Sequence, residues 1–374
     1  MNRQAKHRPI LPIIYLFTAV STVLYLLFIK LPAFADWFNK SIACATRNLL
    51  AVVSNLLPFS IAELLLLLIP LWLFLLLLLA NRYADSARRA LTYVGMLLAG
   101  ICMIWNLFVW TFSAGYFGTT LDTKLSLNRT PVSASELYQT ACLLSEELQK
   151  LEVEILFLPS GASLMPYSHG EMTTKLLDAY DSLHNQYDFI SLSPGRIKPI
   201  MLSEPMSYTH ITSVYTFFTG EANLNVNFPD YTLPFTAAHE LAHQRGIARE
   251  DEANFVAFLV CMQSDDVYIR YSGLLNLYDY VIAALSGADT DLFYQNYATL
   301  PQNVKKERSA YAQFFEKYRD NIAADISSTT NDIYLQSQGN EAGSKSYSMV
   351  VDLAVAYYRT AGSAAQHTAA SCIN

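Results

Sequence analysis

Two histidines and a glutamate in the second half of the chain have a spacing that suits metal chemistry. The segment 235–255 contains His239-Glu240-Leu-Ala-His243. On a helix, His239 and His243 share a face, so both imidazoles can reach one zinc ion. Glu240 stands beside the first histidine, where a carboxylate can take a proton from metal-bound water. We therefore predict that His239 and His243 bind Zn²⁺ and that Glu240 is a catalytic base.

A third metal ligand has to come from a second helix. Gly246 permits the first helix to end, because glycine tolerates the left-handed conformation needed there. A second helix is expected to begin at Glu250. Helical spacing puts Glu250 and Asn254 on one face, so Glu250 would bind the metal and Asn254 would hydrogen-bond a ligand histidine. Glu252 is close enough in the sequence to leave the choice between Glu250 and Glu252 open.

The sequence around these residues resembles known metallopeptidases. His-Glu-Leu-Ala-His followed by Glu-x-x-Ala-Asn is similar to the gluzincins, whose third zinc ligand is a Glu from a second helix. The block from Gly220 to Phe255 resembles more closely a bacterial membrane-anchored family catalogued only as a domain of unknown function. This second resemblance extends over most of the chain. In thermolysin-like enzymes the third ligand lies much further downstream, whereas Glu250 follows His243 by only seven residues, so the chain must reverse tightly at Gly246.

The residues before the predicted zinc helix have the pattern of a strand. Ala222 and Leu224 alternate with Asn223 and Asn225, as in a strand with one buried face. The gluzincin resemblance implies that this strand is a sheet edge that holds an extended peptide substrate. Main-chain groups on such an edge can pair with a peptide. An ordinary structural strand is the alternative.

A hydrolase of this kind also needs a hydrogen-bond donor for the oxyanion that forms on the substrate. The sequence offers four side chains for this role: Tyr347, His210, Tyr215 and Arg245. Tyr347 stands at the start of the last predicted helix, after a polar loop. A structural role is the alternative for each of the four.

The first third of the chain is strongly apolar. Of the 374 residues, 52% are apolar and only 15% are charged, which is too apolar for an ordinary soluble enzyme. Three apolar runs, at about 10–29, 62–80 and 90–110, are each long enough to cross a lipid bilayer as a helix. The net charge of −7 gives no electrostatic support for binding nucleic acid.

Basic residues set the expected orientation in the membrane. They precede the first apolar run and separate the second run from the third: Arg3, Lys6, Arg8, Arg82, Arg88 and Arg89. Because positive loops stay cytoplasmic, we expect a cytoplasmic N-terminus and an extracytoplasmic C-terminal domain. Ala33-Phe-Ala35 resembles a signal-peptidase site, but the preceding run is too long for a usual signal sequence. We therefore expect an uncleaved anchor.

This orientation predicts the outcome of a labelling experiment. A thiol reagent that cannot cross membranes should reach a cysteine placed near Ser363 from outside intact cells. It should not reach one placed near Ser86, which lies in the predicted cytoplasmic link. The opposite labelling pattern would overturn the assignment.

The sequence thus predicts a mainly helical α+β protein in two parts. Residues 1–112 would form a membrane region with three transmembrane helices, and residues 113–374 an extracytoplasmic zincin-like domain with a small β-sheet. The predicted function is a membrane-anchored zinc metallopeptidase that hydrolyses a peptide or protein substrate. The alternative is a non-catalytic zinc protein, such as a sensor or an envelope-assembly factor. Glu240 argues against that alternative, because zinc binding alone does not need it.

Overall fold

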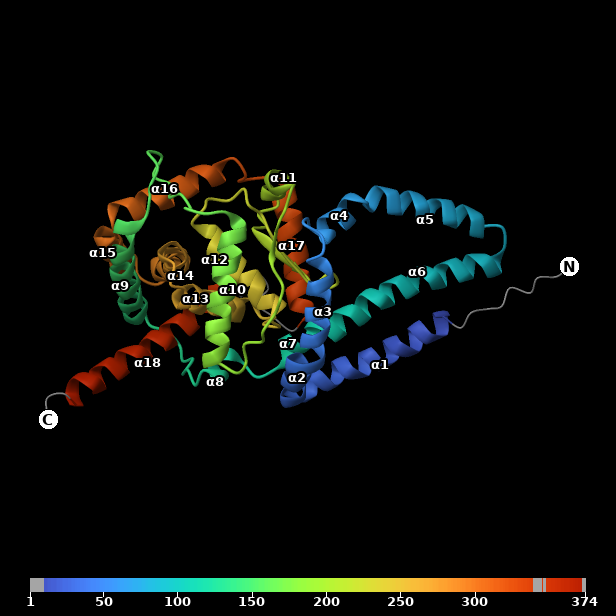
Figure 1. Cartoon of the computed structure of the whole chain (residues 1–374), viewed down its shortest axis with the longest axis horizontal. Helices are drawn as coiled ribbons and strands as arrows, with labels where there is room; N and C mark the ends of the chain where they lie inside the picture. Colours follow the sequence, from blue (N-terminus) through green and yellow to red (C-terminus); the bar gives the residue numbers. More distant parts are fainter. Residues whose placement is uncertain (1–9, 339–344, 346–347, 372–374) are drawn as a thin grey trace.

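The computed structural model describes residues 10–338, 345 and 348–371 of the chain. It is mainly helical and contains a small three-stranded sheet. Figure 1 shows α1, α5 and α6 extending to one side of a larger helical body, with α18 on the other side of that body. The mainly helical α+β architecture predicted from the sequence is therefore confirmed.

The N-terminal part consists of consecutive helical segments. In chain order they are α1 (Ile10–Lys30), α2 (Pro32–Phe38), the π-helical turn η1 (Asn39–Ala43), α3 (Cys44–Ser54), α4 (Ile61–Leu67), α5 (Ile69–Tyr83), α6 (Ala87–Phe108), the π-helical turn η2 (Val109–Ser113) and α7 (Ala114–Phe117).

The remainder of the chain holds the sheet and most of the core. Its helices are α8 (Leu121–Lys124), α9 (Ala134–Leu151), the 3₁₀ turn η3 (Glu152–Glu154), α10 (His169–Gln186), α11 (Ser203–Ser207), α12 (Thr232–Gln244), α13 (Glu250–Gln263), α14 (Val267–Ala288), α15 (Thr290–Thr299), α16 (Gln302–Glu316), α17 (Ile322–Ser337) and α18 (Val350–Ser371). Its strands are β1 (Ile197–Pro199), β2 (Ser213–Thr216) and β3 (Glu221–Leu224).

Two helices in the described part of the chain are long and apolar enough to cross a membrane, not the three predicted. They are Ile10–Lys30 and the continuous run Ala87–Phe117. The predicted middle span at 62–80 is instead a pair, α4 and α5, bent by 53°. Pro70 explains the bend, because proline has no N–H for the helical ladder and its ring clashes with the carbonyl four residues earlier. The pair could cross a membrane only as one broken span.

The prediction that residues 222–225 form a sheet edge is wrong. The strand order is β1-β3-β2, so β3 lies in the middle, parallel to β1 and antiparallel to β2. Ala222, Asn223, Leu224 and Asn225 are all buried. The asparagines bond inside the protein: Asn223 Nδ2 donates to Val214 O at 3.1 Å, and Asn225 donates to a hydroxyl and a carbonyl. The polar residues in the alternating pattern therefore do not mark a solvent face.

Charged side chains of the sheet cap helices of the N-terminal part. The carboxylate of Glu221 accepts hydrogen bonds at 2.9 Å from the first two backbone N–H groups of α4. Lys198 Nζ donates to Ser54 O, the last residue of α3, at 3.0 Å. A negative charge at a helix N-terminus and a positive charge at a C-terminus are both favourable. These contacts join the two parts that the sequence analysis separated at residue 112.

A buried group of aromatic rings joins the apolar helices to the larger body. We call it the aromatic cluster; its members are Phe28, Phe38, Phe108, Phe112 and Tyr116. Each of the five side chains is at most 6% exposed. Burial of a ring of this size contributes about 1.5–3 kcal/mol, so the cluster is a substantial second core. The first core is formed by the helices around α14.

Candidate metal centre

The two helices that carry the predicted ligands are joined by a tight turn at Gly246. Its φ of +92° lies in the left-handed region that favours glycine. A Cβ at this position would lie 2.4 Å from Arg47 Nη2 and 2.5 Å from Asn39 Oδ1. Both conformation and space therefore require glycine here. The turn brings the N-terminus of α13 back over the C-terminal half of α12, as the short interval between His243 and Glu250 requires.

Arg47 of α3 holds the end of α12. Its side chain is completely buried. Nε donates to Gln244 O at 3.1 Å and Nη2 to Arg245 O at 3.4 Å, the carbonyls left without helical partners where α12 ends. Nη1 donates to Thr111 O at 2.7 Å. One residue of the N-terminal part thus ties α12 to the apolar run Ala87–Phe117.

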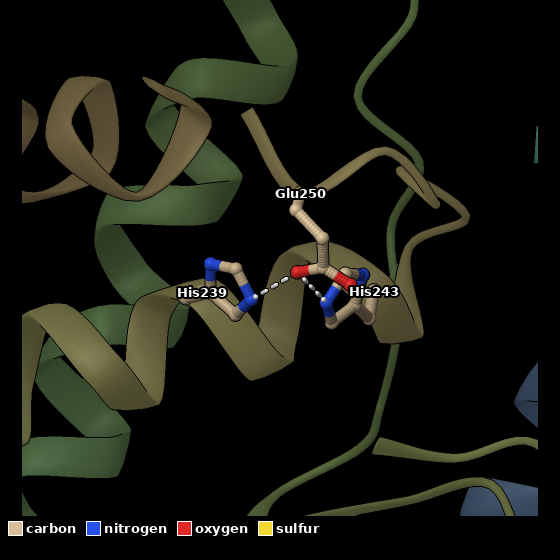
Figure 2. A group of neighbouring side chains, drawn as sticks. All are labelled: His239, His243 and Glu250. Carbon is tan, nitrogen blue, oxygen red and sulfur yellow. Dashed lines mark ion pairs between the residues drawn. The ribbon is translucent and has the colours of Figure 1, made fainter. Parts of the chain in front are cut away.

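Figure 2 shows His239 and His243 on one helix, with Glu250 directed between them. Glu250 Oε2 is 3.2 Å from His239 Nε2 and 3.4 Å from His243 Nε2. One ligand atom from each of the three side chains lies within 4.8 Å of the other two. All three residues are buried. We call these three residues the metal group, because together they could hold a metal ion.

The histidines are oriented by hydrogen bonds from their other ring nitrogens. His239 Nδ1 is 2.8 Å from Asn254 Oδ1, and His243 Nδ1 is 2.7 Å from Ile247 O. Both partners are acceptors, so both Nδ1 atoms carry a proton. In the neutral rings the Nε2 lone pairs then point at Glu250, which is the tautomer a metal ligand needs. Asn254 lies where the sequence analysis expected it.

Electrostatics favour an ion pair between Glu250 and His243 in the absence of metal. Burial alone would raise the pKa of Glu250, but the two histidines outweigh it and hold that pKa well below its ordinary range. Burial alone would lower the pKa of His243, but Glu250 beside it raises the value to about 9. His243 is therefore protonated at neutral pH until a metal displaces the proton.

Metal uptake is expected to depend on pH. Since His243 must lose its proton to act as a ligand, and its pKa is raised to about 9, affinity should increase with pH up to that value. Below pH 9 each bound ion should release about one proton from His243. Calorimetric titration of the full-length protein with Zn²⁺ as the probe ion, in two buffers of different ionisation enthalpy, measures this release. Uptake at pH 7 without proton release would contradict the assignment.

Glu240 lies on α12 beside the metal ligands but is not one of the group. Its Oε1 accepts a hydrogen bond from Ser213 Oγ at 2.5 Å. Its Oε2 is buried and has no hydrogen-bond partner among the described residues. Burial raises the pKa of this carboxyl, which makes it a better proton acceptor than an exposed glutamate. Glu240 thus has one anchored oxygen and one oxygen free to take a proton.

The other acids at the start of α13 face elsewhere. Glu252 Oε1 accepts hydrogen bonds from Leu121 N and from Arg249 Nη1, both at 2.9 Å. Asp251 Oδ2 pairs with Arg129 Nη2 at 2.8 Å. Of the two glutamates left open by the sequence, the one that meets the histidines is therefore Glu250.

The four side chains considered as hydrogen-bond donors to the oxyanion lie in different surroundings. Arg245 has its guanidinium 3.9 Å from the centre of the Tyr180 ring, which favours the structural alternative for this candidate. It follows His243 by two residues, which rotates it to the opposite side of α12. His210 bonds the carbonyl of Tyr318 through Nε2. Tyr347 lies outside the described residues.

Tyr215, the fourth of these, packs its ring against the metal group. Its ring centroid is 6.4 Å from that of His243 and 5.2 Å from that of Phe112. Its hydroxyl is buried without a hydrogen-bond partner among the described residues, and burial raises its pKa. Tyr215 therefore supports His243 from the side of the aromatic cluster.

A large cavity opens in front of the three ligand residues. We call it the metal cavity; its volume is about 1720 Å³, and its lining includes every residue of β2. Two tyrosines that the sequence analysis missed, Tyr280 of α14 and Tyr334 of α17, also line it. Burial, together with the charge of Glu250, raises the pKa of each to about 12, so both hydroxyls stay protonated at neutral pH. Only tertiary packing brings them here, and no local motif marks them.

Comparison with known proteins gives one match. The profile of a family described as "Protein of unknown function (DUF3810)" matches residues 38–355, well over half of the chain. No curated protein matches, and no solved structure matches. The matched region begins at the end of α2, includes the metal group with its supporting Arg47, and ends within α18. The chain therefore belongs to the DUF3810 family.

Proposed function

We propose that this protein is a membrane-anchored, zinc-dependent metallopeptidase of gluzincin type, with its metal centre on the extracytoplasmic side. The observation that carries the proposal is the joint placement of His239, His243 and Glu250 beside the unpartnered Oε2 of Glu240. A site that only stores or senses a metal needs the three ligands. It does not need a buried carboxylate oxygen held next to them without a partner.

The ligand set fits zinc. Two imidazole nitrogens and one carboxylate, with their second-sphere acceptors in place, match the set found in catalytic zinc sites with one open position. A bound Zn²⁺ would supply a Lewis acid that polarises the peptide carbonyl and lowers the pKa of water to near neutral.

Glu240 acts as the general base and then as the general acid of the reaction. Its Oε2 accepts the proton of the attacking water, while Ser213 holds Oε1 and so fixes the orientation of the carboxyl. The raised pKa keeps the proton on Glu240 long enough to be passed to the leaving amine. Tyr280 and Tyr334 are the protonated donors in the metal cavity that can stabilise the oxyanion.

The substrate is an extended peptide placed along β2. This strand pairs only with β3 in the described sheet, so its other edge has main-chain groups available. All four of its residues line the metal cavity, and Ser213 links it directly to Glu240. A peptide that adds to this edge gains main-chain hydrogen bonds beside the ligands. The substrate edge is thus β2 and not the segment 222–225.

Removal and return of metal test the proposal. The full-length protein in detergent should contain about one zinc ion per chain, and the His239→Ala/His243→Ala double variant should contain none. A chelator should abolish cleavage of a mixed peptide library, and added Zn²⁺ should restore it. Cleavage that continues unchanged after the metal has been removed would rule out this mechanism.

A further inference from the structure

The metal centre lies close to the membrane. The first span, α1, has 21 residues and is about 31 Å long at ~1.5 Å per residue, which matches a hydrocarbon layer of ~30 Å. The second span lies beside it: Trp110 Nε1 donates to Ser21 Oγ at 3.0 Å, and the rings of Tyr25 and Phe117 are 5.3 Å apart. Phe112, between these contacts, is therefore level with the outer half of α1.

Phe112 in turn contacts the metal ligands. Its ring centroid is 5.8 Å from that of His243, in an edge-to-face arrangement. Phe112 also lines the metal cavity. The ligand group is thus only one side chain away from a helix that spans the bilayer. A scissile bond at this site would lie at the level of the outer half of the bilayer, not in bulk water.

A second, apolar cavity lies on the membrane side of the protein. We call it the lateral cavity; its volume is about 520 Å³. It lies between α3, α4 and α6, and its lining is almost wholly hydrocarbon: Leu50, Val53, Ser54, Ile61, Leu65, Ile104, Leu107, Phe218 and Thr219. Val53 is 51% exposed and Ile104 57% exposed, so the cavity opens on the lipid-facing surface.

One residue, Phe218, borders both cavities. It stands in the turn between β2 and β3. A ligand that extends from the lateral cavity past Phe218 reaches β2, the strand that leads to Glu240 through Ser213.

The size of the lateral cavity decides what kind of apolar group it takes. A helix that spans the bilayer is ~10 Å wide and ~30 Å long, which gives ~2,400 Å³, several times the volume of the cavity. An extended alkyl chain ~4 Å wide and ~20 Å long needs only ~250 Å³. The cavity therefore has room for an alkyl chain but not for a whole membrane-spanning helix, and its opening faces the layer in which such chains reside.

We propose that the substrate is an acylated peptide whose alkyl anchor occupies the lateral cavity while its backbone passes Phe218 into the metal cavity. This inference rests on the proposed peptidase function and adds its substrate class. The anchor keeps the peptide at the level of the metal centre. It also raises the effective concentration of the substrate, because the peptide and the protein are held in the same membrane.

The test uses the full-length protein in phosphatidylcholine nanodiscs, with Glu240→Gln as background so that the probe stays intact. The probe is a mixture of N-palmitoylated peptides with a photoactivatable diazirine at the end of the acyl chain. Cross-links should map to the lateral cavity. Val53→Trp places an indole in the cavity. The acyl chain and the indole cannot both be packed there without strain, so cross-linking should fall about tenfold. Val52→Trp is the matched control: Val52 is on the same helix and 50% exposed but outside the cavity lining, so cross-linking should persist.

Two results would overturn the inference. One is equal cross-linking in the Val52→Trp and Val53→Trp variants. The other is labelling of the cavity by diazirine-bearing palmitoyl phosphatidylcholine that an excess of unlabelled palmitoyl peptide does not displace, which would assign the cavity to bulk lipid.

Cleavage by the wild-type protein separates this inference from the proposed function. Specific cross-linking without cleavage of any palmitoylated or acetylated peptide supports the acyl-chain site and rejects the peptidase. Equal cleavage of palmitoylated and acetylated peptides without specific cross-linking rejects the acyl-chain site and supports the peptidase. Faster cleavage of the palmitoylated peptides, lost in Val53→Trp and kept in Val52→Trp, supports both.

Discussion

Glu240→Gln is expected to abolish peptide cleavage while the fold and the bound metal remain. The substitution is nearly isosteric, and Ser213 can still bond the side-chain oxygen that replaces Oε1. A neutral amide cannot take the proton that Oε2 takes, and general-base catalysis contributes about 10²–10⁴-fold in rate. Cleavage of the peptide library should fall by at least that order, while metal content by mass spectrometry stays at the wild-type level.

Two neighbouring glutamates provide the controls. Glu250→Gln should lower the metal content itself, since it removes the charged ligand that contacts both histidines. Glu252→Gln, on the same turn of α13, should keep metal and activity because its carboxylate bonds Leu121 N and Arg249. Full activity of Glu240→Gln would show that another group is the base. If wild type and Glu240→Gln both cleave nothing, a zinc protein without catalysis becomes the better interpretation.

Arg47→Met is expected to unfold or strongly destabilise the metal centre, although Arg47 lies far from it in sequence. The variant leaves the carbonyls of Gln244, Arg245 and Thr111 without the donor that satisfies them. Each buried group left unpaired costs about 1–3 kcal/mol, so the total loss for the three carbonyls is on the order of 3–9 kcal/mol. The melting temperature should fall, and metal content should fall with it because the end of α12 carries His243.

Two further variants make this result specific. Arg319→Met removes an arginine whose side chain is 57% exposed and should change neither readout. Arg47→Lys keeps the charge but offers a single ammonium group in place of the planar fork, so it should recover only part of the stability. Wild-type melting and metal content in Arg47→Met would mean that residues 113–374 form their centre independently of the N-terminal part.

The metal group was predictable because its information is local. The spacing of His239 and His243 fixes the face of the first helix, and the glycine after them permits the turn, but the sequence left the choice between Glu250 and Glu252 open. Asn254 followed from the same helical periodicity.

The sheet and the middle apolar segment were harder to predict because their outcome depends on partners. Asn223 and Asn225 look like solvent-facing residues in the sequence, yet their amides bond carbonyls and a hydroxyl inside the protein. In the middle segment, the hydropathy of the leucine run led to the prediction of one transmembrane helix. Pro70 instead bends the segment by 53°.

The remaining site residues come from distant parts of the chain. Ser213 meets Glu240 across 27 residues, and Arg47 meets Gln244 across 197. Neither interval has a periodicity that a single sequence can reveal. The same is true of Tyr280 and Tyr334, which reach the metal cavity from α14 and α17.

The long interval between Arg47 and its partners also fixes an order of events during biosynthesis. Arg47 leaves the ribosome 197 residues before Gln244. At about 5–20 residues per second, the guanidinium waits roughly 10–40 seconds for the carbonyls that bury it. Until then Arg47 has only its nearer partners, the side chain and the carbonyl of Asn39 and later the carbonyl of Thr111. The group of His239, His243 and Glu250 can form only after synthesis has passed α13, so any metal loading must follow the synthesis of the apolar helices.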